Sequence, residues 1–212
     1  MTVTITNVMA ISLDGLIGRN AFESDVERRK YNFTNSDDRE FVREQLVCAD
    51  AVITGANSLR ASGCAWTVNN DRGVNPAWIV FTTKGLSVEL EFWRQKTIRR
   101  VLVSPFPVQE ELCAASGVEN WILTENSPIE VVHRLEREGL GRILLFGGGA
   151  INKLFYENQL VDFAKITVCP LVIGGVNSPR FVDLGLKAPV HFTAIASVLK
   201  QDLVFLTYRV KK

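Results

Sequence analysis

The chain has 212 residues, of which 47% are hydrophobic and 22% charged, and its formal net charge at pH 7 is +1. These values are typical of a globular protein with a sizeable core, and we expect residues 1–212 to form one domain. No long basic run predicts a nucleic-acid partner, and no apolar run is long enough to predict a membrane span or a secretory signal. We therefore expect a cytoplasmic protein that acts on a small molecule.

The chain offers few side chains for binding a metal. Its four cysteines and two histidines are scattered, and no Cys-x-x-Cys pair occurs. A metal site needs such ligands at close, defined spacing. We expect no metal site, and reduced thiols in place of disulfides.

Over the first two thirds of the chain, short apolar runs alternate with helical patterns. The runs predict strands at residues 3–11, 51–54, 78–82, 100–104, 121–124 and 142–146. Capping residues and apolar spacing predict helices at about 37–48, 55–60, 127–139 and 150–158, with a loop at 62–75. Such alternation is typical of a parallel sheet with helices on its faces.

The last third of the chain has a different pattern. Residues 163–168, 190–199 and 204–210 alternate like antiparallel strands, with no helix between them. The whole sequence therefore predicts an α/β fold. Its central sheet is mixed and mostly parallel, with helices on both faces and antiparallel strands at the C-terminal end.

Three consecutive glycines, Gly147, Gly148 and Gly149, separate a predicted strand from a helix that begins at Ala150. Glycine adopts positive φ at little cost and lets a ligand approach the backbone. The first turn of a helix carries unpaired N–H groups and a partial positive charge, which suit a phosphate. The alternative is a tight turn that only helix–sheet packing requires.

A second turn of the same kind follows the strand at 51–54. Its residues are Gly55, Ala56, Asn57 and Ser58. A helix start with amide and hydroxyl groups suits a pyrophosphate or a 2′-phosphate, although Asn57 or Ser58 could simply cap the helix. Arg60, one turn further on, could add positive charge or form a surface ion pair.

Several segments together resemble one known family. They are VMAISLDGLIG at 8–18, ADAVITGANSLRA at 49–61, LFGGG at 145–149, LVD at 160–162 and CPLVIGG at 169–175. In this order they resemble the reductase domain of riboflavin biosynthesis, in the dihydrofolate reductase-like superfamily. The resemblance implies a three-layer fold with about eight strands and NADPH bound across the carboxyl ends of the strands. It also implies reduction of 5-amino-6-(5-phosphoribosylamino)uracil by hydride from the nicotinamide.

The resemblance also implies roles for particular residues. Ile17 and Gly18 would lie beside the nicotinamide. Hydroxyls at strand ends would frame the adenosine half of the cofactor, and these belong to Thr82, Thr83 and Ser104. The same hydroxyls are also common turn formers.

Two acids are the candidate catalytic residues. Asp14 would lie in the loop beside the nicotinamide and the substrate. Asp37 holds a place comparable to the buried acid of dihydrofolate reductases, from which a proton could be relayed. The alternatives are an Asp-Gly turn for Asp14 and stabilisation of a helix start for Asp37.

The chain departs from the family pattern on its substrate side. Phe146 stands where the family usually has an acid before the glycines, and Val8 and Leu16 stand where lysines are usual. A pterin reductase of the same fold, or a nucleotide-binding domain without catalysis, therefore remain alternatives. The family often forms dimers through its C-terminal strands, so we expect a homodimer.

Overall fold

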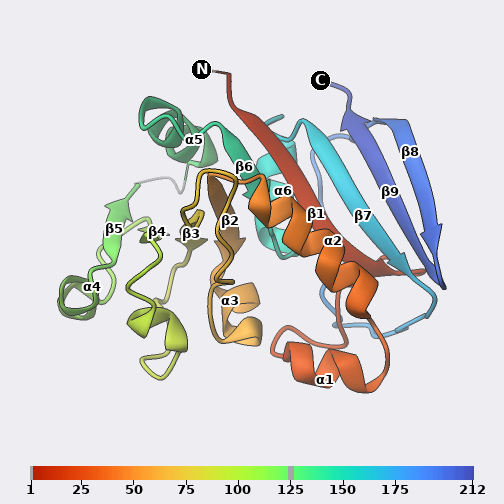
Figure 1. Cartoon of the computed structure of the whole chain (residues 1–212), viewed down its shortest axis with the longest axis horizontal. Coiled ribbons are helices and arrows are strands. Elements are labelled where there is room, and N and C mark those ends of the chain that lie inside the picture. The colour runs from red at the N-terminus through yellow and green to blue at the C-terminus, as the bar shows by residue number, and fades with distance from the viewer. Residues whose placement is uncertain (1, 124–126) are drawn as a thin grey trace.

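The computed structural model describes residues 2–123 and 127–212, and their strands form one sheet in the order β5-β4-β3-β2-β6-β1-β7-β9-β8 (Figure 1). The strands are β1 (Thr4–Ser12), β2 (Ala51–Gly55), β3 (Ala77–Phe81), β4 (Arg100–Ser104), β5 (Glu119–Ile122), β6 (Arg142–Leu145), β7 (Phe163–Cys169), β8 (Phe192–Lys200) and β9 (Leu203–Val210). The helices are α1 (Asp25–Lys30), α2 (Ser36–Val47), α3 (Ala56–Ser62), α4 (Glu110–Ser116), α5 (Pro128–Arg137), α6 (Gly149–Glu157) and the 3-10 turn η1 (Glu91–Arg94).

The sheet is mixed, as the sequence predicts. Strands β1 to β7 pair only in parallel with one another, whereas β9 runs antiparallel to both β7 and β8. The carboxyl ends of β1, β2, β3 and β6 therefore meet at one edge of the sheet. In Figure 1 this is the lower edge, beyond which α1 and α3 lie.

Helices cover both faces of the sheet and complete the three layers. On one face, Leu135 of α5 and Phe155 of α6 pack into a core with the sheet residues Ile53 and Ile79. On the other face, Leu46 of α2 belongs to a second core with further apolar side chains. Every residue of β2, β3 and β4 is buried, as expected for parallel strands covered on both sides. The predicted three-layer α/β fold is confirmed.

An ion pair between the buried Asp50 and the partly exposed Arg142 aligns two strands at the opposite, amino edge. The Asp50 carboxylate accepts hydrogen bonds from the backbone N–H groups of Gly141 (3.1 Å) and Arg142 (2.9 Å) and from the Arg142 guanidinium (2.8 Å). These contacts hold the pKa of Asp50 below its usual value against the opposing effect of burial. They fix the start of β6 beside the start of β2, so that Gly55 and Gly147 meet at the other end.

The differences from the predicted elements are local. The sequence missed α1, η1 and α4, which are short and carry many charged residues. The strand predicted at 121–124 begins at Glu119, and its last predicted residue, Thr124, lies outside the described residues. Among the described helices, none combines the length and the apolar character needed to cross a membrane.

Candidate active site

A cleft of about 750 Å³ opens at the carboxyl edge of the sheet. Its walls are α3, the end of β3, the turn between β6 and α6, the segment 177–183 and part of the loop that follows β1. All but two of the predicted cofactor residues line it. Those that do are Ile17, Gly55, Ala56, Asn57, Ser58, Thr82, Thr83, Gly147, Gly148, Gly149 and Ala150.

The turn at residues 147–149, which we call the glycine turn, leaves no space for side chains. Gly148 has φ +101° and ψ 144°, a conformation that L residues avoid. A Cβ on Gly147 would overlap the Asn152 side chain, and one on Gly149 would lie 2.7 Å from the carbonyl oxygen of Arg180. Gly148 caps α6 without a side-chain hydrogen bond, so the first turn of this helix presents backbone N–H groups.

Buried amides support the glycine turn from behind. Asn152 donates its backbone N–H to the Gly148 carbonyl (2.9 Å) and its Nδ2 to the Phe181 carbonyl (2.7 Å). Its Oδ1 accepts from Nδ2 of Asn7 (3.2 Å), and Tyr156 in turn donates its hydroxyl to Oδ1 of Asn7 (3.0 Å). Sequence reasoning missed this network. An amide in the middle of a predicted buried strand was the signal that could have revealed it.

The second predicted turn lies directly against the first. The Ser58 hydroxyl donates to the Gly147 carbonyl (2.9 Å), and the backbone N–H of Gly55 donates to the same oxygen (3.3 Å). A Cβ on Gly55 would lie 3.0 Å from Cγ1 of Ile151 on α6. The two motifs that are 92 residues apart in sequence, at Gly55 and Gly147, thus form one continuous wall of the cleft.

At the β3 end of the cleft, hydroxyl and guanidinium groups hold the local backbone. Thr82 donates its hydroxyl to the Gly85 carbonyl (3.0 Å). Arg60 donates to the same carbonyl (2.7 Å) and to Oδ1 of Asn57 (2.6 Å). Lys84 also lines this end, so positive charge gathers there.

Two predicted cofactor residues do not line the cleft. Ser104 is buried, and its hydroxyl donates to the Phe106 carbonyl (2.7 Å), which is the turn-forming arrangement. Gly18 follows Ile17 but faces inward, where its Cβ would lie 3.1 Å from Oε2 of Glu23. Of the two predicted residues of this loop, only Ile17 lines the cleft, together with the unpredicted Ala21.

The geometry of Asp14 indicates a structural role. Its exposed carboxylate accepts hydrogen bonds from the Ser12 hydroxyl (2.5 Å) and from the backbone N–H groups of Gly174 (2.8 Å) and Ile173 (3.1 Å). These bonds lower the pKa of Asp14 to about 2. The side chain joins the loop after β1 to the loop after β7 and remains ionised at neutral pH, so it is a poor proton donor.

The buried acid at the start of α2 is Asp38 and not Asp37. Asn35 caps this helix, and Asp37 is only half-buried, whereas Asp38 is 7% exposed. Burial raises the pKa of Asp38, and the Thr167 side chain on β7 opposes only part of this shift. One oxygen, Oδ1, is buried without a hydrogen-bond partner. The carboxyl therefore favours its protonated form more than an exposed acid does, although it does not line the cleft.

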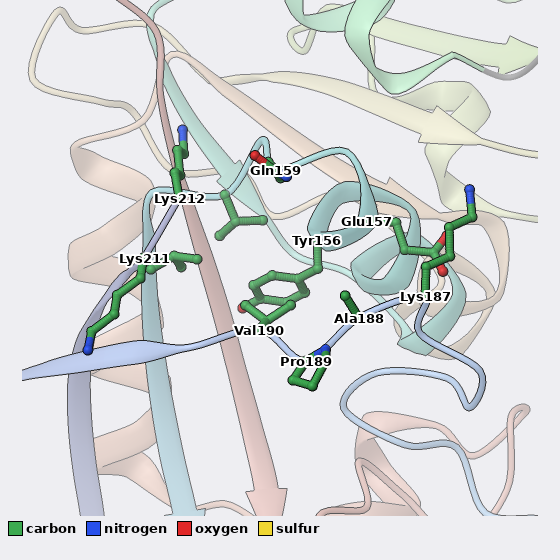
Figure 2. Close-up of a pocket in the computed structure, with 11 residues that line it drawn as sticks. Tyr156, Glu157, Gln159, Lys187, Ala188, Pro189, Val190, Lys211 and Lys212 are labelled. Carbon is green, nitrogen blue, oxygen red and sulfur yellow. The ribbon is translucent and has the colours of Figure 1, made fainter.

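A second, smaller hollow of about 140 Å³ lies at the amino edge of the sheet (Figure 2). Tyr156 and Val190 lie at its centre, and the side chains of Lys187, Lys211 and Lys212 extend away from them. This volume is well below the ~300–1,000 Å³ of typical ligand pockets. Within the described residues, no three His, Cys, Asp or Glu side chains gather closely enough to hold a metal ion.

Two curated proteins illustrate the sequence similarity. One is the riboflavin biosynthesis protein PYRR of Arabidopsis thaliana, 27% identical over 65% of this chain, which spans only 24% of that protein. The other is the 2,5-diamino-6-ribosylamino-4(3H)-pyrimidinone 5′-phosphate reductase of Archaeoglobus fulgidus. It is 24% identical over 82% of this chain and 84% of its own length.

Solved structures share the fold. A pyrimidine reductase-like protein from Corynebacterium diphtheriae matches 99% of this chain and 92% of its own, with a TM-score of 0.78 and 17% identity. Dihydrofolate reductase from Enterococcus faecalis, solved with NADP(H), matches 99% and 97% with a TM-score of 0.56 and 15% identity. The family model of the RibD C-terminal domain matches residues 3–202, and the chain therefore belongs to the RibD C-terminal domain family.

Proposed function

We propose that this protein is an NADPH-dependent reductase of a ribosylaminopyrimidine 5′-phosphate, the kind of substrate named for its Archaeoglobus relative. The observation that carries the proposal is the side-chain-free glycine turn, which opens onto a cleft of dinucleotide size in a chain of this family. The bound nicotinamide would supply hydride to the substrate. The protein would contribute binding, orientation and electrostatics.

The cleft fits a dinucleotide phosphate at two places. The uncapped start of α6 offers N–H groups to a pyrophosphate, since no Cβ on residues 147–149 keeps it away. Arg60 and Lys84, at the β3 end, supply positive charge that suits a 2′-phosphate and favours NADPH over NADH. Ile17 provides an apolar wall that would exclude water from the nicotinamide.

Asp38 is our candidate for the source of the proton that must accompany hydride transfer. It lies in the first turn of α2, against the carboxyl half of β7. A buried carboxyl with a raised pKa can remain protonated closer to neutral pH. A buried acid at the start of α2 also favours a second candidate function, reduction of a dihydropterin. Phe146 agrees with this alternative, because it stands where the riboflavin enzymes usually have an acid before the glycines.

The functional test is turnover by the full chain. We expect NADPH oxidation, followed at 340 nm, with 5-amino-6-(5-phosphoribosylamino)uracil or its 2,5-diamino-pyrimidinone counterpart. Turnover of dihydrofolate alone would instead support the pterin function. Binding of NADPH with no turnover of any of these compounds would instead support a nucleotide-binding domain without catalysis.

Gly148→Ala tests the cofactor site. A methyl group at φ +101° would strain the turn and lie 3.0 Å from the Ser58 hydroxyl. We expect NADPH to bind about tenfold more weakly or worse, a loss of roughly 1.4 kcal/mol or more. The smaller rise of the melting temperature with NADPH would report it.

The matched control for this variant is Gly139→Ala. Gly139 also has positive φ (+76°), but open space surrounds it at the end of α5, away from the cleft. It should lower stability and leave NADPH affinity unchanged. Equal NADPH affinity in both variants would remove the glycine turn from the cofactor site.

Asp38→Asn should stabilise the protein and impair the reaction. Folding raises the pKa of Asp38, so the protonated carboxyl stabilises the folded chain fully below about pH 3.8, the ordinary pKa of an aspartate. This contribution to stability is lost as the pH rises through the pKa of the folded state. The amide removes this loss, so the gain in melting temperature should grow as the pH rises above about 3.8. Removal of a proton donor should lower kcat about 100-fold or more.

Asp37→Asn is the control, because Asp37 lies in the same helical turn but is only half-buried. It should leave kcat unchanged. An Asp38→Asn protein with undiminished kcat would show that the proton comes from elsewhere.

We also propose that a second copy of the chain covers β8. This edge strand is exposed at every residue except Phe192, which is half-buried, and it carries the apolar side chains of Ile195, Val198 and Leu199. An open edge of nine residues invites pairing with another strand. A dimer in the cytoplasm is consistent with the four unpaired cysteines.

Sedimentation equilibrium tests the dimer. The wild-type chain should have twice the monomer mass, and Leu199→Asp should shift the equilibrium toward monomer. Leu184→Asp is a matched control, since Leu184 is similarly exposed (75% against 71%) but lies outside β8. A monomeric wild type would contradict the proposal.

A further inference from the structure

We propose that Arg28 binds the anionic group of the substrate, a phosphate ester or a carboxylate, at the β1 end of the cleft. The inference rests on the proposed function in one respect only, namely that the cleft holds a cofactor and a second small molecule together. It adds the residue that selects the second molecule. Arg28 lies outside all the segments that resemble the family, at 8–18, 49–61, 145–149, 160–162 and 169–175.

The fold holds Arg28 at the cleft through a well-defined helix start. In α1, the Ser24 hydroxyl accepts from the backbone N–H of Glu27 (3.2 Å), and the Glu27 carboxylate accepts from the backbone N–H of Ser24 (2.8 Å). This capping box fixes the first turn. Of the six residues of α1, all of them described, only Arg28 lines the cleft, beside Ile17 and Ala21.

Within the part of the chain that the structure describes, the Arg28 guanidinium has two long ion-pair contacts and no hydrogen-bonded acceptor. Its Nε is buried and without a hydrogen-bond partner. The nearest carboxylate oxygens are 3.9 Å away on Glu23 and 3.7 Å away on Asp25, both beyond hydrogen-bond distance. A buried donor without an acceptor destabilises the folded chain. A ligand oxygen in the cleft would remove that destabilisation.

The adjacent buried acid is already engaged elsewhere. The side chain of Glu23 is fully buried, and it accepts from the backbone N–H of Arg19 (2.9 Å), from Nε of Arg19 (2.6 Å) and from the Tyr31 hydroxyl (2.6 Å). These bonds occupy both carboxylate oxygens. Glu23 therefore holds the loop together and leaves the donors of Arg28 available.

The sheet order places Arg28 apart from the groups that suit the cofactor. Between β3 and β1 lie β2 and β6, so these strands are separated by three spacings of about 4.8 Å, or ~14 Å. Arg60 and Lys84 belong to the β3 end, the glycine turn follows β6, and Arg28 belongs to the loop and helix that follow β1. A dinucleotide that runs from the β3 end to the glycine turn, with its nicotinamide against Ile17, leaves the guanidinium of Arg28 for another ligand.

The chemistry of Arg28 defines the ligand class. A guanidinium fork matches the paired oxygens of a phosphate or a carboxylate, and it binds them with charge-assisted hydrogen bonds. The lining of the cleft includes one acid, Asp183, which comes from the segment 177–183. A neutral or cationic group would gain nothing from Arg28, so the substrate should carry its negative charge at this end.

The test measures binding of two anionic probes to the NADPH-saturated full chain by titration calorimetry. Ribose 5-phosphate represents a phosphate ester and 4-aminobenzoylglutamate represents a carboxylate, with ribose as the uncharged comparison. We expect one anionic probe to bind the wild type, and Arg28→Met to weaken it at least tenfold. Arg29→Met, the neighbouring exposed arginine, is the matched control and should leave binding unchanged.

Several outcomes would overturn the proposal. These are an equal loss in both variants, no binding of either anionic probe by the wild type, and a tenfold loss of NADPH affinity in Arg28→Met, which would assign Arg28 to the cofactor. If Arg28→Met does not fold, Arg28→Lys keeps the charge without the fork and should weaken the probe several-fold. Failure of pyrimidine turnover with probe binding intact would contradict the proposed substrate and leave the role of Arg28 standing.

Discussion

The cleft depends on one steric constraint, the lack of space for any side chain at the junction of β6 and α6. Asn152 packs against Gly147, Ser58 against Gly148, and the backbone at Arg180 against Gly149. Because these groups come from α6, α3 and the segment 177–183, the junction joins three parts of the chain. The same absence of side chains leaves the backbone N–H groups at the start of α6 open to the cleft.

Some buried polar groups of this protein have hydrogen-bond partners, and a few do not. The groups that shape the backbone are fully paired, as in the network of Asn7, Asn152 and Tyr156 behind the glycine turn. Asp38 and Arg28, by contrast, each keep a buried atom without a hydrogen-bond partner. A buried polar atom left unpaired lowers stability, and such atoms are retained where a ligand or a proton supplies the missing partner. Of the four such atoms among the described residues, which also include Oδ1 of Asn75 and Nε1 of Trp78, only Nε of Arg28 belongs to a residue that lines the cleft.

The geometry of an α-helix explains why the sequence indicated Asp37, whereas the buried acid in the structure is its neighbour Asp38. Successive residues of an α-helix point about 100° apart, so Asp37 and Asp38 cannot both face the sheet. The run Ser-Asp-Asp at the start of α2 indicates a helix start but does not report which acid faces inward. The packing of α2 against β7 decides it, and that contact joins residues about 130 positions apart in the chain. For a similar reason the sequence left the role of Asp14 open, since its partners Ile173 and Gly174 lie on a distant loop.

The sequence by itself determined the sheet, the two glycine turns and about half of the residues of the cleft wall, because strand and helix periods and glycine turns are local properties of the chain. The sequence also revealed the family, because the motifs that resemble it are local segments at the strand ends. Only the tertiary structure decided which acid is buried, that Ser104 serves a turn, and that Arg28 lines the cleft without a close acceptor. Burial and the pairing of a charge depend on groups that are distant in sequence, and these groups meet only when the sheet assembles.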